Sequence, residues 1–116
     1  MKEQQIQNAI LDYLKIMNIF AFRLNTGGFS GTYKGKKWFV RSHNLGKGAA
    51  DIFALVPYAE AADMHKSQTA FWIEVKNDKG QQSIEQKQFQ QYVEGLGHKY
   101  ILARSVDDIR DLWMER

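Results

Sequence analysis

Two carboxylates and one lysine stand in this sequence where their side chains could meet at a single site. Glu74 and Lys76 lie two residues apart in a run of aromatic and β-branched residues, so on a strand they would project from the same face. Asp51 is the single charge in the apolar run 49–58, where a carboxylate is unfavourable unless a cation or hydrogen-bond donors accompany it. Groups of this kind bind a divalent metal beside a phosphate.

These residue types fit the hydrolysis of a phosphodiester bond. Mg²⁺ prefers carboxylate, carbonyl and water oxygens at about 2.0–2.1 Å, and Asp51, Glu74 and a backbone carbonyl would supply such ligands. Lys76 would orient or deprotonate the attacking water and offset the charge that develops on the phosphate. A Glu-x-Lys triplet also occurs on ordinary strand surfaces, so the structural alternative is a pair of solvated charges.

The elements that must position these residues follow from the hydrophobic spacing. Residues 3–17 have the period of a helix with one buried face, marked by Ile6, Ile10, Leu14 and Met17. Extending that face back by one turn reaches Glu3, so this carboxylate is directed toward whatever the helix packs on. A negative charge in the first helical turn is also favourable by itself, which is the structural alternative for Glu3.

The rest of the chain alternates between strands and helices. The expected strands are 19–25, 37–42, 49–58, 69–76 and 98–103, and the expected helices are 83–96 and 107–114. A glycine-rich loop is expected between the first two strands. The passage from residue 69 to residue 103 is a strand–helix–strand crossover, which requires at least one parallel strand pair. We therefore expect an α/β fold, a single domain over residues 1–116 with a mixed central sheet flanked by helices.

The order of these motifs resembles a known family. Gly48-x-x-Asp51, then Ile73-Glu74-Val75-Lys76, then Ser83-x-x-Gln86 at the start of a helix, is similar to the PD-(D/E)XK nuclease superfamily, specifically its virus-type replication-repair nuclease (VRR-NUC) branch. The resemblance extends over nearly the whole chain, to about Asp108. One departure is Ala50, which stands where the family often has a proline that ligates nothing.

The resemblance implies a restriction-endonuclease-like fold and a Mg²⁺- or Mn²⁺-dependent endonuclease acting on DNA. The catalytic residues that it implies are Glu3, Asp51, Glu74, Lys76 and Gln86, and the metal ligands are Asp51, Glu74, the carbonyl of Val75, and Glu3. Gln86 has a second reading of equal weight, because Ser83-x-x-Gln86 is also a capping box. Small free-standing members of this branch are similar to Holliday-junction resolvases and are found in phages and prophages. Paired cuts across a symmetric junction lead us to expect a homodimer.

The charge distribution favours a polyanionic partner. The formal net charge is +3, and there is no Asp or Glu between Tyr13 and Ala50. Within that stretch we expect phosphate contacts from Lys34, Lys36, Lys37, Arg41 and Lys47. A solvated basic surface on flexible linkers would have the same composition.

Composition excludes several other classes of protein. The chain has no cysteine, which excludes disulfides, thiolate zinc sites and cysteine nucleophiles. No apolar run approaches the roughly 20 residues that span a bilayer, and the N-terminus is polar, so we expect a soluble cytoplasmic protein without membrane contact. His98 and Trp72 are expected to have structural roles. The remaining alternatives are a nicking or flap nuclease on other branched or single-stranded DNA, and a non-catalytic DNA-binding subunit.

Overall fold

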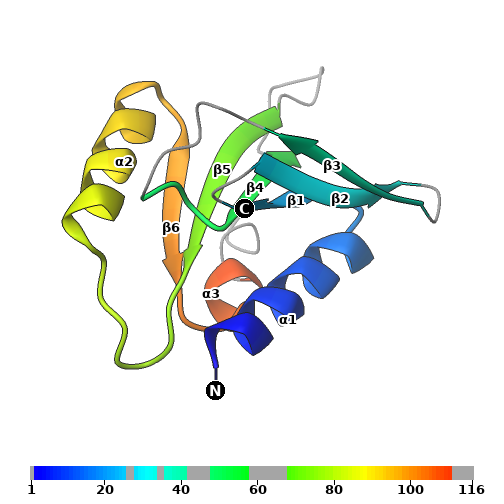
Figure 1. Cartoon of the computed structure of the whole chain (residues 1–116), viewed down its shortest axis with the longest axis horizontal. Coiled ribbons are helices and arrows are strands. Elements are labelled where there is room, and N and C mark those ends of the chain that lie inside the picture. The colour runs from blue at the N-terminus through cyan, green and yellow to red at the C-terminus, as the bar shows by residue number, and fades with distance from the viewer. Residues whose placement is uncertain (1, 26–27, 34–35, 42–47, 58–67, 111–116) are drawn as a thin grey trace.

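The structure is a computed structural model that describes residues 2–25, 28–33, 36–41, 48–57 and 68–110. Its elements are α1 (Glu3–Ile16), β1 (Phe20–Asn25), β2 (Gly28–Tyr33), β3 (Lys36–Arg41), β4 (Ile52–Pro57), β5 (Gln68–Val75), α2 (Ile84–Gly95), β6 (Lys99–Ala103) and α3 (Val106–Arg110). The strands form one sheet in the order β3-β2-β1-β4-β5-β6. Figure 1 shows the sheet with helices packed around it.

The sheet is mixed, as the sequence predicts. Strands β5 and β6 are parallel, with Ile73 opposite Ile101, whereas the other four neighbouring pairs are antiparallel. The parallel pair is the one that the crossover from residue 69 to residue 103 requires, because α2 connects these two strands. The predicted α/β class with a mixed central sheet flanked by helices is therefore confirmed.

One expected loop is a strand. Residues 28–33, expected within a glycine-rich loop, form β2, which pairs with β3 along its whole length and with the end of β1. Glycine has little preference for strands, but the ladder hydrogen bonds on both sides outweigh that local bias. Helix α3 begins at Val106, close to its expected start at residue 107, and its expected end at residue 114 lies outside the described residues.

One face of the sheet carries the apolar core. Helix α1 places Ile10 and Leu14, both fully buried, against alternate residues of β4 and β5 such as Ile52 and Ile73. The buried residues of α3 and β6, Ile109 and Ala103, complete the same cluster. These strands alternate because successive side chains point to opposite faces, so the intervening residues of β5 lie on the other side of the sheet.

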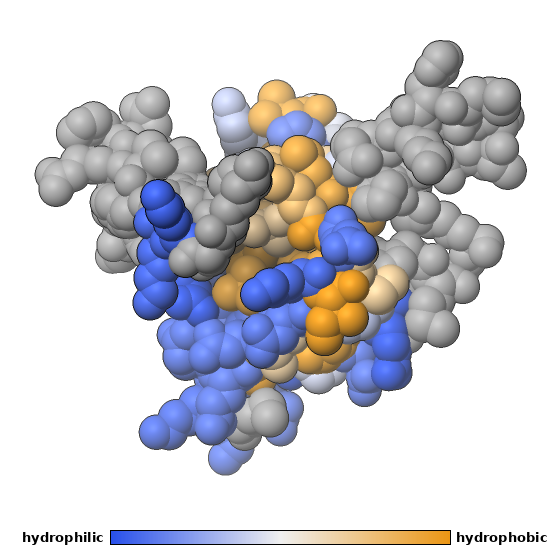
Figure 2. Space-filling view, turned by 90° about the vertical axis from the view of Figure 1, so that its right-hand side faces the viewer, coloured by the Kyte–Doolittle hydropathy of each residue, from blue (hydrophilic) through white to orange (hydrophobic). Residues whose placement is uncertain are grey.

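The predicted buried stripe of α1 ends one turn earlier than its spacing suggests. The helix ends at Ile16, so Met17 lies at its C-terminal cap and is 45% exposed instead of extending the stripe. Ile16 and Phe20 are exposed as well. Figure 2 shows the side of the molecule where α1 ends, with apolar side chains bordered by polar ones. Within the described residues, no helix is long and apolar enough to cross a membrane.

The opposite face is covered at one end by α2 and is rich in aromatic rings. Phe53 and Trp72, on neighbouring strands, have ring centroids 4.7 Å apart, and Phe89 of α2 lies 5.2 Å from Trp72. The indole Nε1 of Trp72 donates a hydrogen bond to Nδ1 of His98 at 3.0 Å. Trp72 and His98 therefore pack and bond to one another, and the aromatic layer fixes α2 on the face that also carries Glu74.

Candidate active site

Asp51 lies immediately before β4, where the backbone of three strands holds it. Its N–H donates to the carbonyl of Ile73 at 3.0 Å, and its own carbonyl accepts from Leu24 N–H at 2.7 Å. Its Oδ2 atom accepts a 2.7 Å hydrogen bond from Val75 N–H, which directs the carboxylate toward the end of β5. The position of Asp51 is therefore set by β1 and β5 as well as by its own strand.

Gly48 allows the segment before Asp51 to approach α2. Its φ angle of +94° lies in the region that side chains with a Cβ rarely adopt. A Cβ at this position would lie 2.5 Å from the backbone carbonyl carbon of Glu85, in the first turn of α2. Glycine at position 48 thus brings the chain that carries Asp51 directly against the start of the helix that carries Gln86.

Glu74 is a buried carboxylate, only 2% exposed, on the face of β5 opposite the apolar core. Its Oε2 atom accepts a 2.9 Å hydrogen bond from Nε2 of Gln86. Its Oε1 atom is buried without a hydrogen-bond partner among the described residues. A buried carboxylate oxygen without a donor is energetically costly, so this atom requires a cation, a proton or a water.

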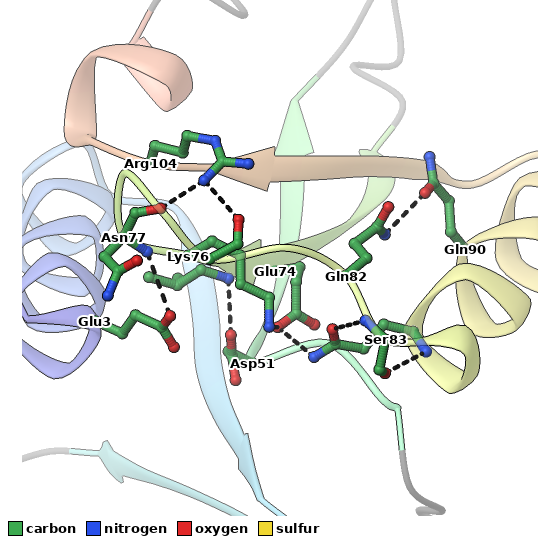
Figure 3. A network of polar contacts seen from close by, with 12 residues as sticks. Glu3, Asp51, Glu74, Lys76, Asn77, Gln82, Ser83, Gln90 and Arg104 are labelled. Carbon is green, nitrogen blue, oxygen red and sulfur yellow. Dashed lines mark hydrogen bonds and ion pairs between the residues drawn. The ribbon is translucent and has the colours of Figure 1, made fainter.

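Lys76 follows β5 and lies on the same side of the chain as Glu74. Its Nζ atom is 4.0 Å from Glu74 Oε2, and its side chain is 14% exposed. Its backbone N–H donates to the carbonyl of Ala103 at 3.0 Å, which continues the parallel pairing one residue beyond the strand. The structure thus brings Asp51, Glu74 and Lys76 together at one end of β4 and β5, as Figure 3 shows.

The two carboxyls affect each other's protonation. Burial and, after it, the charge of the neighbouring Asp51 raise the pKa of Glu74 to about 8, while the Lys76 ammonium opposes the shift. Burial also raises the pKa of Asp51, against the lowering effect of the hydrogen bond from Val75. A pair of acids that is difficult to ionise without a counter-charge is a strong binding site for a cation.

Gln86 forms the predicted capping box with Ser83 and also contacts Glu74. Its Oε1 atom accepts from Ser83 N–H at 2.8 Å and its own N–H donates to Ser83 Oγ at 3.1 Å, which is the capping box. Its Nε2 atom meanwhile donates to Glu74. The cap therefore fixes the orientation of the amide and leaves its donor end directed at the buried carboxylate.

Glu3 lies beside this group and faces a turn. Its Oε2 atom accepts from Asn77 N–H at 3.3 Å, directly after Lys76. Its charge contributes to the raised pKa of both Asp51 and Glu74. In the part of the chain that the structure describes, no three Asp, Glu, His or Cys side chains are grouped closely enough to hold a metal by themselves. Asp51 and Glu74 are thus a pair, with Glu3 adjacent to it.

Two of the predicted phosphate-contact residues lie on β3, away from the carboxylate pair. Lys36 and Lys37 are exposed on β3, which is separated from β5 by three strands, or about 19 Å at 4.8 Å per strand spacing. Arg41 lies on β3, but its side chain is not among those described. Lys34 and Lys47 fall outside the described residues. The structure does not bring Lys36 and Lys37 to the carboxylate pair.

Two residues of this region had no signal in the sequence. Arg104, just after β6, donates from Nη1 to the carbonyls of Asn77 and Gly80. Asn77 itself accepts from Lys79 N–H at 3.0 Å through its side chain. Arg104 is 28 residues beyond Lys76 and no local motif links the two, so only the pairing of β5 with β6 reveals the contact.

The donor set fits a divalent cation. Asp51 and Glu74 are adjacent hard ligands, and Glu74 Oε1 is buried without a partner within the described residues. A divalent ion would replace the mutual repulsion of the carboxyls by attraction to both. The chemistry of the pair therefore suits a hard divalent cation, which prefers carboxylate oxygens as ligands.

Comparison with solved structures gives a match to a structure described as "VRR_NUC domain". The match has a TM-score of 0.61 and 15% sequence identity, and it covers 98% of this chain and 95% of that chain. Comparisons with family models and with curated proteins give no match. At this identity the likeness is one of fold, and it confirms the fold expected from the motifs.

Proposed function

We propose that the chain is a divalent-metal-dependent nuclease that hydrolyses phosphodiester bonds in DNA. The observation that carries this proposal is the buried Glu74, whose Oε1 atom has no partner among the described residues and whose neighbours are Asp51 and Lys76. Its support is twofold: the chemistry of that set suits phosphate hydrolysis, and the fold is shared with a VRR_NUC domain. A structural ion-pair network would not leave a carboxylate oxygen buried and unpartnered.

Asp51, Glu74 and the carbonyl of Val75 would hold Mg²⁺ or Mn²⁺. On an extended strand the N–H and C=O of one residue point to the same edge, and the N–H of Val75 points to Asp51. The carbonyl of Val75 is therefore directed to the same side. Glu3 would help to hold the metal by its charge, because it lies close enough to influence both carboxyls. When bound, the metal supplies a Lewis acid that lowers the pKa of water and neutralises charge on the phosphate.

Lys76 and Gln86 complete the proposed catalytic set. Lys76, whose Nζ atom lies 4.0 Å from Glu74 Oε2, would orient or deprotonate the attacking water and offset the charge that develops on the scissile phosphate. Gln86 would keep the Glu74 carboxylate in one rotamer through the 2.9 Å hydrogen bond from its Nε2 atom. Because the amide of Gln86 is itself fixed by Ser83, this orientation is set before any ligand arrives.

For the substrate we propose branched DNA, with four-way junctions first and flaps or nicked duplexes as the alternative. The support is the likeness of the motifs to small VRR-NUC proteins. Two symmetric cuts would require two copies of this site, so we propose a homodimer on such a junction. Lys36 and Lys37 lie on β3, an edge strand that three strands separate from β5, so they would contact phosphates distant from the cut.

Cleavage of a panel of end-labelled DNAs tests the proposal. Four-way junctions, flaps, nicked and intact duplexes and single strands are incubated with wild type in Mg²⁺, in Mn²⁺ and in EDTA, and with Asp51→Asn. A matched control is Asp78→Asn, which removes an exposed carboxylate from the turn after Lys76. We expect metal-dependent cutting by wild type and the control only. Binding without cutting by wild type in either metal would instead support a non-catalytic DNA-binding subunit.

A further inference from the structure

Arg104 holds the turn that follows Lys76. Its Nη1 atom donates to the carbonyl of Asn77 and, at 2.8 Å, to the carbonyl of Gly80. The same turn is closed by Gly80 N–H, which donates to the carbonyl of Asn77 at 3.2 Å. A single guanidinium therefore joins the first residue of the turn to the last, as Figure 3 shows for Arg104 and Asn77. Hydrogen bonds from a charged donor are stronger than neutral ones.

The turn lies against the side chain of Lys76. A Cβ at Gly80 would lie 3.1 Å from Lys76 Cδ and 3.0 Å from Glu3 Oε2, so only a glycine backbone fits there without displacement. The aliphatic part of Lys76 thus lies close against the turn, and the side chain is only 14% exposed. A free lysine side chain samples many rotamers, at a cost of about 2 kcal/mol to fix, so confinement of its stem keeps the ammonium near Glu74.

The turn is anchored from two different elements of the fold. The N–H of Arg104 donates to Asp108 Oδ2 at 2.8 Å, in the first turn of α3. The preceding residue, Ala103, accepts from the N–H of Lys76. Glu3 binds the N–H of Asn77 from the side of α1. The turn is therefore held by α1 through a carboxylate and by the end of β6 through a guanidinium.

We propose that Arg104 is a positioning residue for the hydrolysis. Through the carbonyls of Asn77 and Gly80 it keeps the turn pressed on the stem of Lys76, and so keeps the Lys76 ammonium beside Glu74. Within the described residues, the hydrogen bonds of the Arg104 guanidinium go to these two carbonyls and not to Asp51, Glu74 or the Lys76 ammonium. The catalytic consequence rests on the proposed function, whereas the control of Lys76 by Arg104 is a property of the folded chain that needs no substrate.

Two measurements on the same variants test the proposal. The variants are Arg104→Gln, Arg104→Lys and, as a matched control, Arg110→Gln, which removes a 50% exposed guanidinium paired with Asp107 on the neighbouring helix. The first measurement is the rate of pulsed amine acylation at Lys76, read by mass spectrometry against the exposed Lys87 as internal reference. The second is kcat and KM for DNA cleavage at saturating Mn²⁺, below the melting temperature of every variant.

For Arg104→Gln we expect faster labelling of Lys76 and a kcat that falls about 10- to 100-fold, because a small displacement of a catalytic group has effects of this size. KM should stay within about twofold, since substrate binding is untouched. Arg104→Lys should recover part of both values, because an ammonium can still donate to a carbonyl. Arg110→Gln should match wild type in both.

Two results would overturn the proposal. One is Lys76 labelling at the wild-type rate in folded Arg104→Gln, because the turn would then not depend on Arg104. The other is a raised KM with unchanged kcat, which would make Arg104 a substrate contact. If wild type cuts no DNA in the panel, the proposed function fails, and labelling alone decides whether Arg104 controls Lys76. If Arg104→Gln does not fold, Arg104→Lys provides the same two comparisons.

Discussion

The two faces of the sheet use the same strands for opposite purposes. On the face covered by α1, the side chains of Ile73 and Val75 are 1% exposed and belong to the apolar core cluster. On the face covered by α2, Glu74, between them in the chain, is almost as inaccessible at 2% but carries an ionisable carboxyl with one oxygen that has no partner in the described residues. Burial to a similar extent is therefore favourable for the apolar side chains of one face and unfavourable for the carboxyl on the other.

This difference distinguishes the face that stabilises the fold from the face that carries the candidate site. The core face satisfies every local rule, because apolar residues at strand and helix spacing meet one another. The site face departs from this pattern at Glu74, which is a buried carboxyl. Its neighbours Asp51 and Lys76 are also ionisable, so the three residues form one polar group. Violations of packing rules that are concentrated in one place are typical of functional sites.

Ile73→Ala is the strongest test of the core face. Removing a fully packed side chain from the centre of the cluster should lower the free energy of unfolding by about 2–5 kcal/mol. Cleavage at a temperature where the variant is still folded should be much less affected, since the side chain points away from the carboxylates. Denaturant unfolding and single-turnover cleavage measure the two effects separately, and a large loss of cleavage by folded protein would contradict the separation of the faces.

Glu74→Gln, one residue along the chain, should have the reverse effect. It replaces a buried carboxylate by an amide of the same shape, so cleavage should fall at least about a hundredfold, because even outer-shell changes at metal sites cost 10- to 100-fold. The thermal midpoint without metal should stay the same or rise, since burial and the charge of Asp51 both disfavour the ionised group. A clear loss of stability would show that Glu74 is a structural residue.

Much of this contrast was visible in the sequence, and the missing parts have a physical cause. The periodicity of residues 3–17 predicted α1, and the crossover predicted the parallel pair, because both signals are local or topological. Strand β2 was missed because its ladder partners on β1 and β3 outweigh the glycines within it. The prediction that Met17 continues the buried face of this helix was wrong, because the helix ends before Met17.

The sequence also predicted part of the candidate site. Asp51, Glu74 and Lys76 were brought into one hypothesis by the order of their motifs, and the structure places them together. The sequence alone could not decide whether Gln86 contacts Ser83 or Glu74, because the two contacts use different ends of one amide. The contacts of Arg104 could not be predicted from the sequence, because they are made to backbone carbonyls, and every residue has such a carbonyl.

Two glycines with positive φ allow a smaller test of how the site face is assembled. Gly97→Ala should cost about 1–2 kcal/mol from backbone strain alone, because a Cβ there would meet nothing within 4 Å. Gly48→Ala should cost more, because its Cβ would also lie 2.5 Å from the Glu85 backbone. It should reduce cleavage too, since the segment carrying Asp51 must move away from α2. Equal unfolding energies and equal cleavage for the two variants would refute a positional role for Gly48.

The pH dependence of the free energy of unfolding should also distinguish the two faces, through a smaller effect. The pKa of Glu74 is raised from its ordinary value of 4.5 to about 8 in the folded, metal-free protein, so the folded state binds the proton more tightly than the unfolded state. The stabilisation by that proton is complete below about pH 4.5 and is lost as the pH rises toward 8. The slope cannot exceed about 1.4 kcal/mol per pH unit for one proton. The core residues do not titrate and contribute nothing to it.

The measurement is the thermal midpoint of wild type minus that of Glu74→Gln, between pH 5 and 8.5 in EDTA. This difference should fall as the pH rises, because only wild type loses a bound proton at position 74. Added Mg²⁺ should reverse the sign at the alkaline end, since the ionised pair of Glu74 and Asp51 is then the form that binds the cation. A difference independent of pH would mean that Glu74 is ionised throughout the range, and burial would then not govern its charge.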